Sequence, residues 1–307
     1  MMASDNPTVT VLMSVYNGEK YLAEAIESIL SQTYDDFEFL IIDDCSTDES
    51  ANIIHSFKDE KIVYKKNRTN IGQTKSLNKG IKLANGEYIA RIDQDDESNS
   101  TRLEKQLSFL KENNCHVVGS WFNVINSNGE LLYKNKLPVE PQDIINLMTW
   151  SNPIAHSSAM IKKDELISLN SYPEYFSHGM DMALWIKFVQ NNYKIMNIPE
   201  YLINWRQHNQ SSSKNPNNLI LNLCEEIELL NISKNMNADN KYKKINLAFT
   251  YYTYIFLFFA KIRSKTFHVK SFFRILNIRD FIYFLFFAVP IIFKSNVGKL
   301  IGLKRIY

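Results

Sequence analysis

The segment Gly86–Asp96, which reads GEYIARIDQDD, decides the predicted fold of this 307-residue chain. Its apolar part, Tyr88–Ile92, is typical of a short buried strand. The strand pattern ends in the carboxylates Asp93, Asp95 and Asp96, which repel one another unless a cation or several donors compensate their charge. The segment therefore predicts either a site for Mg²⁺ or Mn²⁺ with a bound diphosphate, or a solvated acidic loop that caps the next helix.

Strand and helix patterns alternate on the N-terminal side of this segment. The expected strands are 8–15, 37–42 and 62–64, and the expected helices are 21–30, about 46–57 with Ser46 or Asp48 as its cap, and 73–84. Alternation of this kind predicts an α/β fold in which crossover helices join parallel strands. Ligands of such sheets bind beyond the carboxyl ends of the strands, so Asp43 and Asp44 should share a crevice with the Asp93–Asp96 cluster.

The remainder of the chain divides at a polar segment, 211–218. Before it we expect a helix at 103–113, a strand at 117–125, a turn at 126–129, a helix at 180–191 and a strand at 194–198. We therefore predict a catalytic domain over residues 1–215 and a C-terminal extension over residues 216–307.

The extension differs from the body in charge and in composition. From Lys241 to Tyr307 there are 13 Lys or Arg residues against one acid, Asp280, whereas the remainder has 22 basic and 32 acidic residues. Its aromatic-rich runs, 247–260 and 281–293, are shorter than the ~20 residues of a membrane-spanning helix. Basic clusters around short apolar runs favour helices that lie in an anionic membrane interface. The alternative is an extension packed on the body or on a second subunit.

The basic charge and the cysteines also bear on the partner and the compartment. Nucleic acid fits the basic charge, but the aromatic runs are too continuous for stacking platforms interleaved with charge, so no nucleic-acid partner is predicted. The cysteines Cys45, Cys115 and Cys224 form neither a metal-ligand spacing nor a disulfide framework. Because the N-terminus lacks a signal-peptide pattern, we expect a cytoplasmic protein that is peripheral on the inner face of the cell membrane.

Six motifs in this order and spacing resemble the family 2 glycosyltransferases over roughly residues 9–213. They are VTVLMSVYN at 9–17, SILSQTY at 28–34, IDDCSTD at 42–48, NIG at 70–72, NKG at 78–80 and the 86–96 segment. The resemblance implies a GT-A fold with a mostly parallel sheet flanked by helices, a nucleotide-sugar donor, typically a UDP-sugar, and inversion at the anomeric carbon.

The resemblance implies roles for five residues on the donor side. Ser14 and Tyr16 would line the nucleotide site, and Asp44 would hydrogen-bond the base. Asp93 would face the donor ribose or sugar and contribute to the metal site, and Asp95 would ligate Mn²⁺ or Mg²⁺. From the residues alone, Tyr16 could equally be a packing aromatic and Asp44 a helix cap.

The segment 179–185, GMDMALW, resembles the family's Glu-Asp pair followed by Leu-Trp. Asp181 matches the catalytic base, while Met180 stands where the family has Glu. A carboxylate within reach of the acceptor hydroxyl can take its proton as the oxygen attacks. The alternative for Asp181 is a helix-start residue that the helix dipole favours.

The segment 205–213, WRQHNQSSS, is similar to the family's Tyr-Arg-x-His-x-x-Ser stretch, with Trp in place of Tyr. Arg206 would then contact the donor phosphates, and His208 would close over the donor and ligate the metal. The alternative is a surface loop with a solvent-facing histidine. His156, in the segment 152–158, fits either a position near the sugar or acceptor or a satisfied structural histidine.

Together these features predict an inverting, metal-dependent hexosyltransferase. Its acceptor would be a saccharide, expected to be lipid-linked, in bacterial surface polysaccharide synthesis of the capsule or O-antigen type. A sugar-phosphate nucleotidyltransferase would normally carry a Gly-rich, Arg-containing phosphate loop after the first strand, whereas Val15–Gly18 has a single glycine. An inactive scaffold is the remaining alternative, because Met180 departs from the motif.

Overall fold

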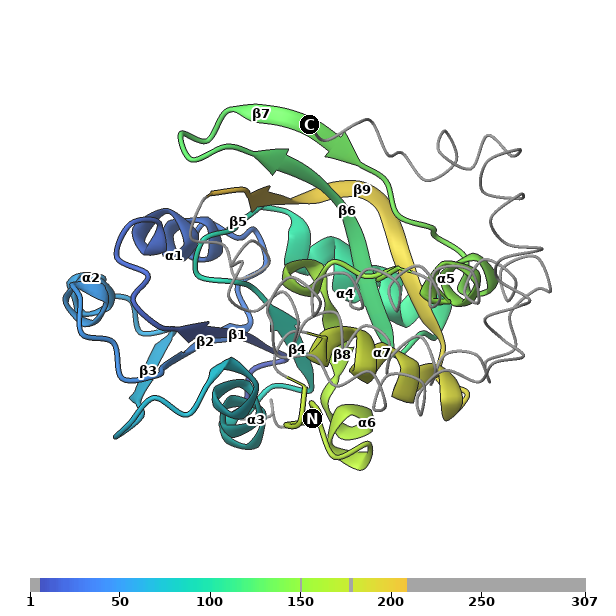
Figure 1. Ribbon diagram of the computed structural model, residues 1–307, viewed down its shortest axis with the longest axis horizontal. Helices are drawn as coiled ribbons and strands as arrows, with labels where there is room; N and C mark the ends of the chain where they lie inside the picture. The colour runs from blue at the N-terminus through green and yellow to red at the C-terminus, as the bar shows by residue number, and fades with distance from the viewer. Residues whose placement is uncertain (1–5, 150, 177–178, 209–307) are drawn as a thin grey trace, which may run out of the picture.

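A single nine-stranded sheet runs through residues 6–149, 151–176 and 179–208, which are the residues that the computed structural model describes (Figure 1). The strands are β1 (Val9–Val15), β2 (Phe37–Asp43), β3 (Ile62–Lys66), β4 (Tyr88–Arg91), β5 (Glu97–Ser98), β6 (Val117–Ile125), β7 (Leu131–Asn135), β8 (Met160–Lys162) and β9 (Ile195–Arg206). The helices are α1 (Leu22–Leu30), α2 (Ser50–Ser56), α3 (Gln73–Leu83), α4 (Arg102–Asn113), α5 (Pro141–Met148), α6 (Lys163–Ser168) and α7 (Met180–Gln190), with a 3₁₀ turn at His156–Ser158. The predicted C-terminal extension, 216–307, lies outside the described residues.

The sheet has the order β3-β2-β1-β4-β8-β6-β9-β5, and β7 pairs with β6. The first four strands are mutually parallel, as the sequence predicts. Beyond β4 the expectation of a mostly parallel sheet is wrong, because β8 is antiparallel to β4 and β6, β7 to β6, and β5 to β9. The short turn between β6 and β7 can only join antiparallel strands. The result is a mixed sheet in which β6 and β9 form the second parallel pair.

Most predicted elements are confirmed to within a few residues, and the exceptions have physical causes. β9 is longer than the predicted 194–198 because it continues past Pro199 as far as Arg206. The register against β6 shifts there, so that Ile198 pairs with Ser120 and Tyr201 with Trp121. Proline is accommodated in a strand at such an irregularity, where its missing N–H is not needed.

Each face of the sheet carries its own apolar core, and β1 shows how the residues are divided. Leu12 packs in the cluster that contains α3 and α7, whereas Val11 and Met13 pack in the cluster that contains α1 and α4. Side chains that alternate along a strand point to opposite faces. With helices on both faces, β1 is buried along its whole length, so the residues that follow the strand, rather than the strand itself, are available for a site.

The carboxyl ends of β1, β2 and β4 lie at the same edge of the sheet. Val15 pairs with Asp43, and Leu12 pairs with Arg91, so the segments that follow these three strands start side by side. The predicted meeting of Asp44 and the Asp93–Asp96 cluster at one edge of the sheet is therefore confirmed, and the shared crevice stays a prediction. Asp43 is fully buried and accepts from the Tyr64 hydroxyl (2.6 Å) and the Ser46 N–H (2.7 Å).

Of the two predicted caps of α2, Ser46 is wrong, whereas Asp48 does bond the first turn of the helix. The residue that directly precedes the helix is Glu49, whose own side chain makes no cap hydrogen bond. Ser46 Oγ instead accepts a hydrogen bond from the Asn17 N–H (3.1 Å), and Asp48 accepts one from Glu19 N–H (3.0 Å). Asp48 also accepts one from Ser50 N–H (3.0 Å), inside the helix. These polar side chains join the loop after β2 to the loop after β1.

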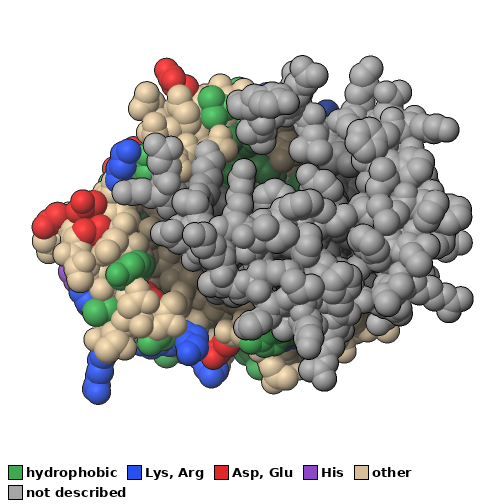
Figure 2. All heavy atoms as spheres, in the orientation of Figure 1, with side chains coloured by type: hydrophobic (Ala, Val, Ile, Leu, Met, Phe, Trp, Pro, Cys, Tyr) green, Lys and Arg blue, Asp and Glu red, His purple; other side chains and the backbone are tan. Residues whose placement is uncertain are grey.

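None of the helices in the described ranges is long and apolar enough to cross a membrane. On the described part of the face in Figure 2, acidic side chains gather at the α2 end and Lys and Arg side chains lie nearer β3 and α3. The membrane-associating helices that the sequence predicts fall on residues outside these ranges.

Gly86 provides a test of the packing between the start of β4 and β1. A Cβ at Gly86 would lie 2.4 Å from Thr10 N and 2.6 Å from Val9 C, which are backbone atoms that cannot turn aside. We expect Gly86→Ala to lower the free energy of unfolding by about 1–3 kcal/mol, as overpacking generally does. Urea denaturation measures the change. Ser108→Ala, on the exposed side of α4, is the control; equal stabilities would contradict this close approach.

Candidate active site

The nucleotide-side residues lie where the sequence predicts, at the end of β1. Ser14 is buried within the strand, and the Tyr16 ring just beyond it is 47% exposed. The Tyr16 backbone is held by Gln94, whose Oε1 accepts from the Tyr16 N–H (2.8 Å) and whose Nε2 donates to the Tyr16 carbonyl (3.2 Å). An exposed ring on a fixed backbone can stack on a flat ligand, so the packing-aromatic alternative for Tyr16 has no support here.

Asp44 is buried at the end of β2 and accepts three hydrogen bonds. The donors are Asn67 Nδ2 (2.8 Å), Ile71 N–H (2.9 Å) and Gly72 N–H (2.7 Å). Gly72 immediately precedes α3 and has φ +89°, a conformation that favours glycine. Asp44 therefore ties the end of β2 to the start of α3, and its contact with a base stays a prediction.

Asp93 is held by three side chains. Its Oδ1 accepts from the Arg91 guanidinium and from Gln73 Nε2 (3.1 Å), and its Oδ2 accepts from Ser157 Oγ (2.7 Å). Burial raises its pKa, but the charge of Arg91, together with His156 and the hydrogen bonds from Ser157 and Arg91, outweighs burial and holds the pKa at about 2. Asp93 is thus ionised and oriented by protein donors at both oxygens, which suits a sugar-facing carboxylate better than a metal ligand.

Arg91 and His156 lie behind Asp93. The Arg91 guanidinium is fully buried and also donates to the Leu12 carbonyl (3.0 Å) and to His156 Nε2 (3.2 Å). The same imidazole nitrogen lies 2.8 Å from the Tyr172 hydroxyl. Burial, and then the Arg91 charge, lower the pKa of His156 to about 3, so its ring is neutral. His156 therefore occupies the structural position that was one of its two predicted alternatives.

Asp95 and His208 form the pair that best fits a cation. His208 Nε2 lies 2.7 Å from Asp95 Oδ2, and the Tyr21 ring is 5.0 Å from the imidazole. Burial and the neighbouring Asp93 charge raise the pKa of Asp95, and a bound cation would relieve this repulsion. Among the described residues no group of three or more His, Cys, Asp or Glu could hold a metal. One carboxylate and one imidazole suit Mn²⁺ or Mg²⁺ if phosphate oxygens supply further ligands.

Arg206 was predicted to contact donor phosphates, but in this structure its guanidinium engages carboxylates. It is 1% exposed and forms ion pairs with Glu24 and Glu97. It also donates to the Asp95 carbonyl (3.0 Å) and lies over the Tyr21 ring (4.6 Å). The phosphate contact stays a prediction. The observed contacts make Arg206 a support for the Asp95 loop.

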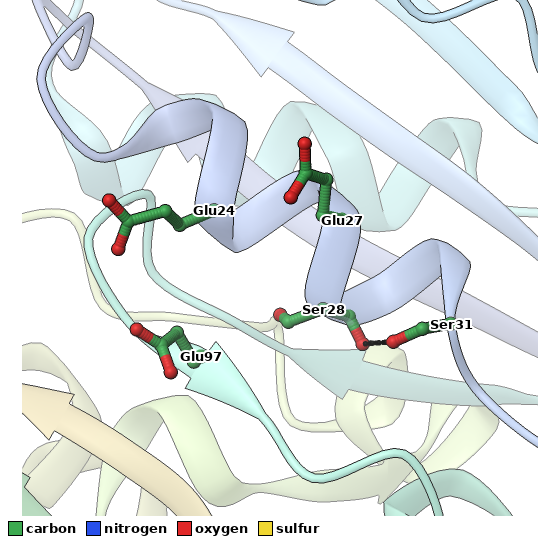
Figure 3. A pocket seen from close by; sticks show the side chains of 5 residues that line it. All are labelled: Glu24, Glu27, Ser28, Ser31 and Glu97. Atoms are coloured by element: carbon green, nitrogen blue, oxygen red, sulfur yellow. Dashed lines mark hydrogen bonds between the residues drawn. The ribbon is translucent and has the colours of Figure 1, made fainter. Parts of the chain in front are cut away.

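The two glutamates of this ion-pair group line a separate cavity of about 480 Å³ between α1 and β5 (Figure 3). Their carboxylates extend into it from the helix and from the strand, and Glu27, Ser28 and Ser31 complete its lining. None of the predicted site residues lines this cavity, so it is distinct from the edge where β1, β2 and β4 end.

Asp181 lies in the first turn of α7, where the sequence predicts the catalytic base. Its Oδ2 accepts from Asn152 Nδ2 (2.6 Å), and its Oδ1 accepts from Met182 N–H (2.8 Å). Burial raises its pKa to about 6, and the Asp93 charge adds to the increase, so the two carboxylates sense each other. Met180 is buried, and its sulfur accepts from Thr74 Oγ1 (2.8 Å), so the departure from Glu leaves a packed side chain beside the predicted base.

Several residues that support this site had no individual role predicted from the sequence. Asp96 is buried, and one of its oxygens accepts from the Arg206 N–H (2.9 Å). Arg91, Asn152 and Ser157 each bond one of the predicted carboxylates or their neighbours. The sequence does indicate that Arg91 has a buried partner, because an arginine inside an apolar strand requires a buried acceptor.

Replacing Arg206 separates its two roles. We expect Arg206→Met to lower the free energy of unfolding by about 2 kcal/mol, because Glu24 and Glu97 lose their partner; the exposure of Glu24 keeps the loss below that of a fully buried pair. Lys105→Met, which breaks a surface pair with Glu200, should change it by no more than about 0.5 kcal/mol. Chemical denaturation measures both. Unchanged stability with weaker nucleotide binding would instead support the phosphate role.

Comparisons with known proteins agree with this geometry. The model of "Glycosyl transferase family 2" matches residues 10–169, more than half of the chain. An uncharacterised glycosyltransferase of Methanocaldococcus jannaschii is 34% identical over 213 residues, which cover 68% of this chain and 73% of that protein. The O-antigen biosynthesis glycosyltransferase WbnJ of Escherichia coli is 34% identical over 212 residues, covering 67% and 82% respectively.

A solved structure supports the fold. S. aureus TarS 1–349, crystallised in complex with UDP-GlcNAc, is similar with a TM-score of 0.60 at 22% identity, covering 80% of this chain and 72% of that chain. At this identity the likeness concerns the fold alone. The fold, the converging carboxylates and the family match together establish that this chain belongs to glycosyltransferase family 2.

Proposed function

We propose that this glycosyltransferase moves a sugar from a UDP-sugar to a hydroxyl of a saccharide acceptor, with inversion at the anomeric carbon. The observation that carries the proposal is the pair of carboxylates in opposite electrostatic environments. Asp93 is held ionised by Arg91, whereas burial raises the pKa of Asp181 to about 6. Carboxylates whose environments separate their pKa values are expected to take different roles in one reaction.

Asp181 would act as the general base. Its carboxylate takes the proton of the acceptor hydroxyl while that oxygen forms a bond to the anomeric carbon. The bond from this carbon to the diphosphate oxygen breaks, and its electron pair leaves with UDP. A single displacement from the face opposite the diphosphate inverts the anomeric carbon. Asn152, which donates to Asp181 Oδ2, would orient the base and leave its other oxygen toward the first turn of α7.

Asp95 and His208 would hold Mn²⁺ or Mg²⁺. A bound cation would neutralise the charge that develops on the departing diphosphate. The 2.7 Å approach of Asp95 and His208 and the raised pKa of Asp95 support this assignment. Ser14, Tyr16 and Asp44 would take the nucleoside, and Asp93 the ribose or the transferred sugar.

The donor and acceptor classes rest on related proteins. TarS was crystallised with UDP and with UDP-GlcNAc, which supports a UDP-sugar donor. WbnJ is an O-antigen glycosyltransferase, and TuaG of Bacillus subtilis is described as a putative teichuronic acid glycosyltransferase. These names support a role in surface polysaccharide synthesis. The basic and aromatic sequence of residues 216–307 adds support for a lipid-linked acceptor at the inner membrane face.

Donor hydrolysis and transfer across UDP-, GDP- and dTDP-sugars test the proposal directly. With Mn²⁺ present, the wild type should release nucleoside diphosphate from a UDP-sugar, and chelation with EDTA should abolish the release. Asp95→Ala should lose the metal-dependent rate. A protein that binds no nucleotide in the presence of metal would fit the scaffold alternative instead.

Asp181→Asn removes the base and keeps its shape. We expect kcat to fall about 10²–10⁴-fold while the Kd for UDP stays within about twofold, since general-base catalysis contributes on that scale. Asp164→Asn, an exposed acid in the first turn of α6, is the matched control. Calorimetry and initial rates give both quantities, and a full rate in Asp181→Asn would reject this base.

The pH dependence of kcat follows from the raised pKa of Asp181. The base must be deprotonated, so kcat should rise with pH through about pH 6 and level off above it, falling about tenfold per unit below. Saturating donor and metal keep the titration of Asp95 out of the profile. The small residual rate of Asp181→Asn should lack this step, and a step of the same size in that variant would assign it to another group.

A further inference from the structure

Gln94, the middle residue of the Asp93–Asp95 motif, bonds the loop after β1. Its half-buried side chain reaches from the loop after β4 to the loop after β1. There its amide both accepts from the Tyr16 N–H (2.8 Å) and donates to the Tyr16 carbonyl (3.2 Å). A side-chain amide that satisfies both backbone groups of one residue fixes the position and the orientation of that peptide segment.

Gly18 makes room for this contact. A Cβ at Gly18 would lie 2.7 Å from both Cδ and Oε1 of Gln94. Gly18 is not among the residues with positive φ, so its backbone conformation does not require glycine. Its N–H is also fixed, because it donates to Ser50 Oγ (2.9 Å). The absence of a side chain at Gly18 is therefore explained by the amide of Gln94.

Gln94 lies between two carboxylates of the predicted site in the chain. Its neighbours are Asp93, which Arg91 and Ser157 hold, and Asp95, which lies against His208. A displacement of the Tyr16 backbone would be passed through Gln94 to both carboxylates. The nucleotide side and the cation side of the site are thus joined by one side chain.

We propose that Gln94 is a positioning residue that locks the Tyr16 loop to the Asp93–Asp95 loop, so that nucleotide and cation bind to one preassembled unit. The inference rests on the proposed function for what the two loops bind. Without the lock, each ligand would have to order its own loop, and each would lose affinity. Because linkage is reciprocal, the cation would then strengthen UDP binding by a smaller factor.

The first test measures the Kd of UDP by calorimetry with and without Mn²⁺. Gln94→Ala and Gln94→Met should each raise the Kd in Mn²⁺ about tenfold, as expected for the loss of two ordinary hydrogen bonds. The factor by which Mn²⁺ improves UDP binding should shrink in both variants. A residue that only stabilises the fold would lower the resistance to urea and leave this factor unchanged, and that result would overturn the proposal.

The second test is a double-mutant cycle with Gly18→Ala, which displaces the amide without removing it. Alone, Gly18→Ala should raise the Kd of UDP about as much as Gln94→Ala. In the Gln94→Ala background it should add no more than about twofold, because the obstructing side chain is gone. A full additional effect in that background would show that Gly18 acts independently and would overturn the lock.

The same cycle separates this inference from the proposed function. If the wild type binds no nucleoside diphosphate with or without Mn²⁺, the proposed function fails, and the cycle is then run on the urea midpoint. If the changes in the urea midpoint caused by Gly18→Ala and Gln94→Ala are not additive, the contact that joins the two loops is still supported. Additive midpoints, or nucleotide binding that is identical in the wild type and all three variants, would reject it.

Discussion

The buried guanidinium of Arg91 is the charge on which the acidic edge of the sheet depends. Carboxylates placed together at the end of a buried strand are unstable unless something neutralises them. Arg91 does so from within β4, where it is fully buried and pairs with Asp93. The guanidinium also donates to the Leu12 carbonyl and to His156, so these buried N–H groups have hydrogen-bond acceptors.

Two further buried arginines bond main-chain oxygens at the end of β4 and in the loop after it. Arg102, on α4, is fully buried and donates to the carbonyls of Arg91 and Ala159. Arg206, at the end of β9, donates to the Asp95 carbonyl and pairs with two glutamates. Arg102 thus holds the end of β4, and Arg206 holds the backbone of the loop that follows it. The Asp95 side chain remains directed toward His208.

Motifs and alternating patterns were enough to predict the β1–β4 half of the sheet and the edge at which its acidic residues meet. The direction of long side chains was not predictable in this way. Arg206 matches a phosphate-binding position in the family's motif, yet its partner Glu24 is 182 residues away in the sequence. No local pattern records such a contact. The strands β5 and β8, of two and three residues, are likewise too short to show a period, so the mixed half of the sheet was missed.

The segment 152–158 connects the two halves of the site. Asn152 donates to Asp181, His156 accepts from Arg91, and Ser157 donates to Asp93. One short stretch thus bonds Asp181, which we propose as the base, Asp93, and the buried Arg91 that pairs with Asp93. In a displacement reaction the base and the leaving group must lie on opposite sides of one carbon, and small misplacements are costly. Because a single segment bonds both carboxylates, its packing constrains the positions of Asp93 and Asp181 together.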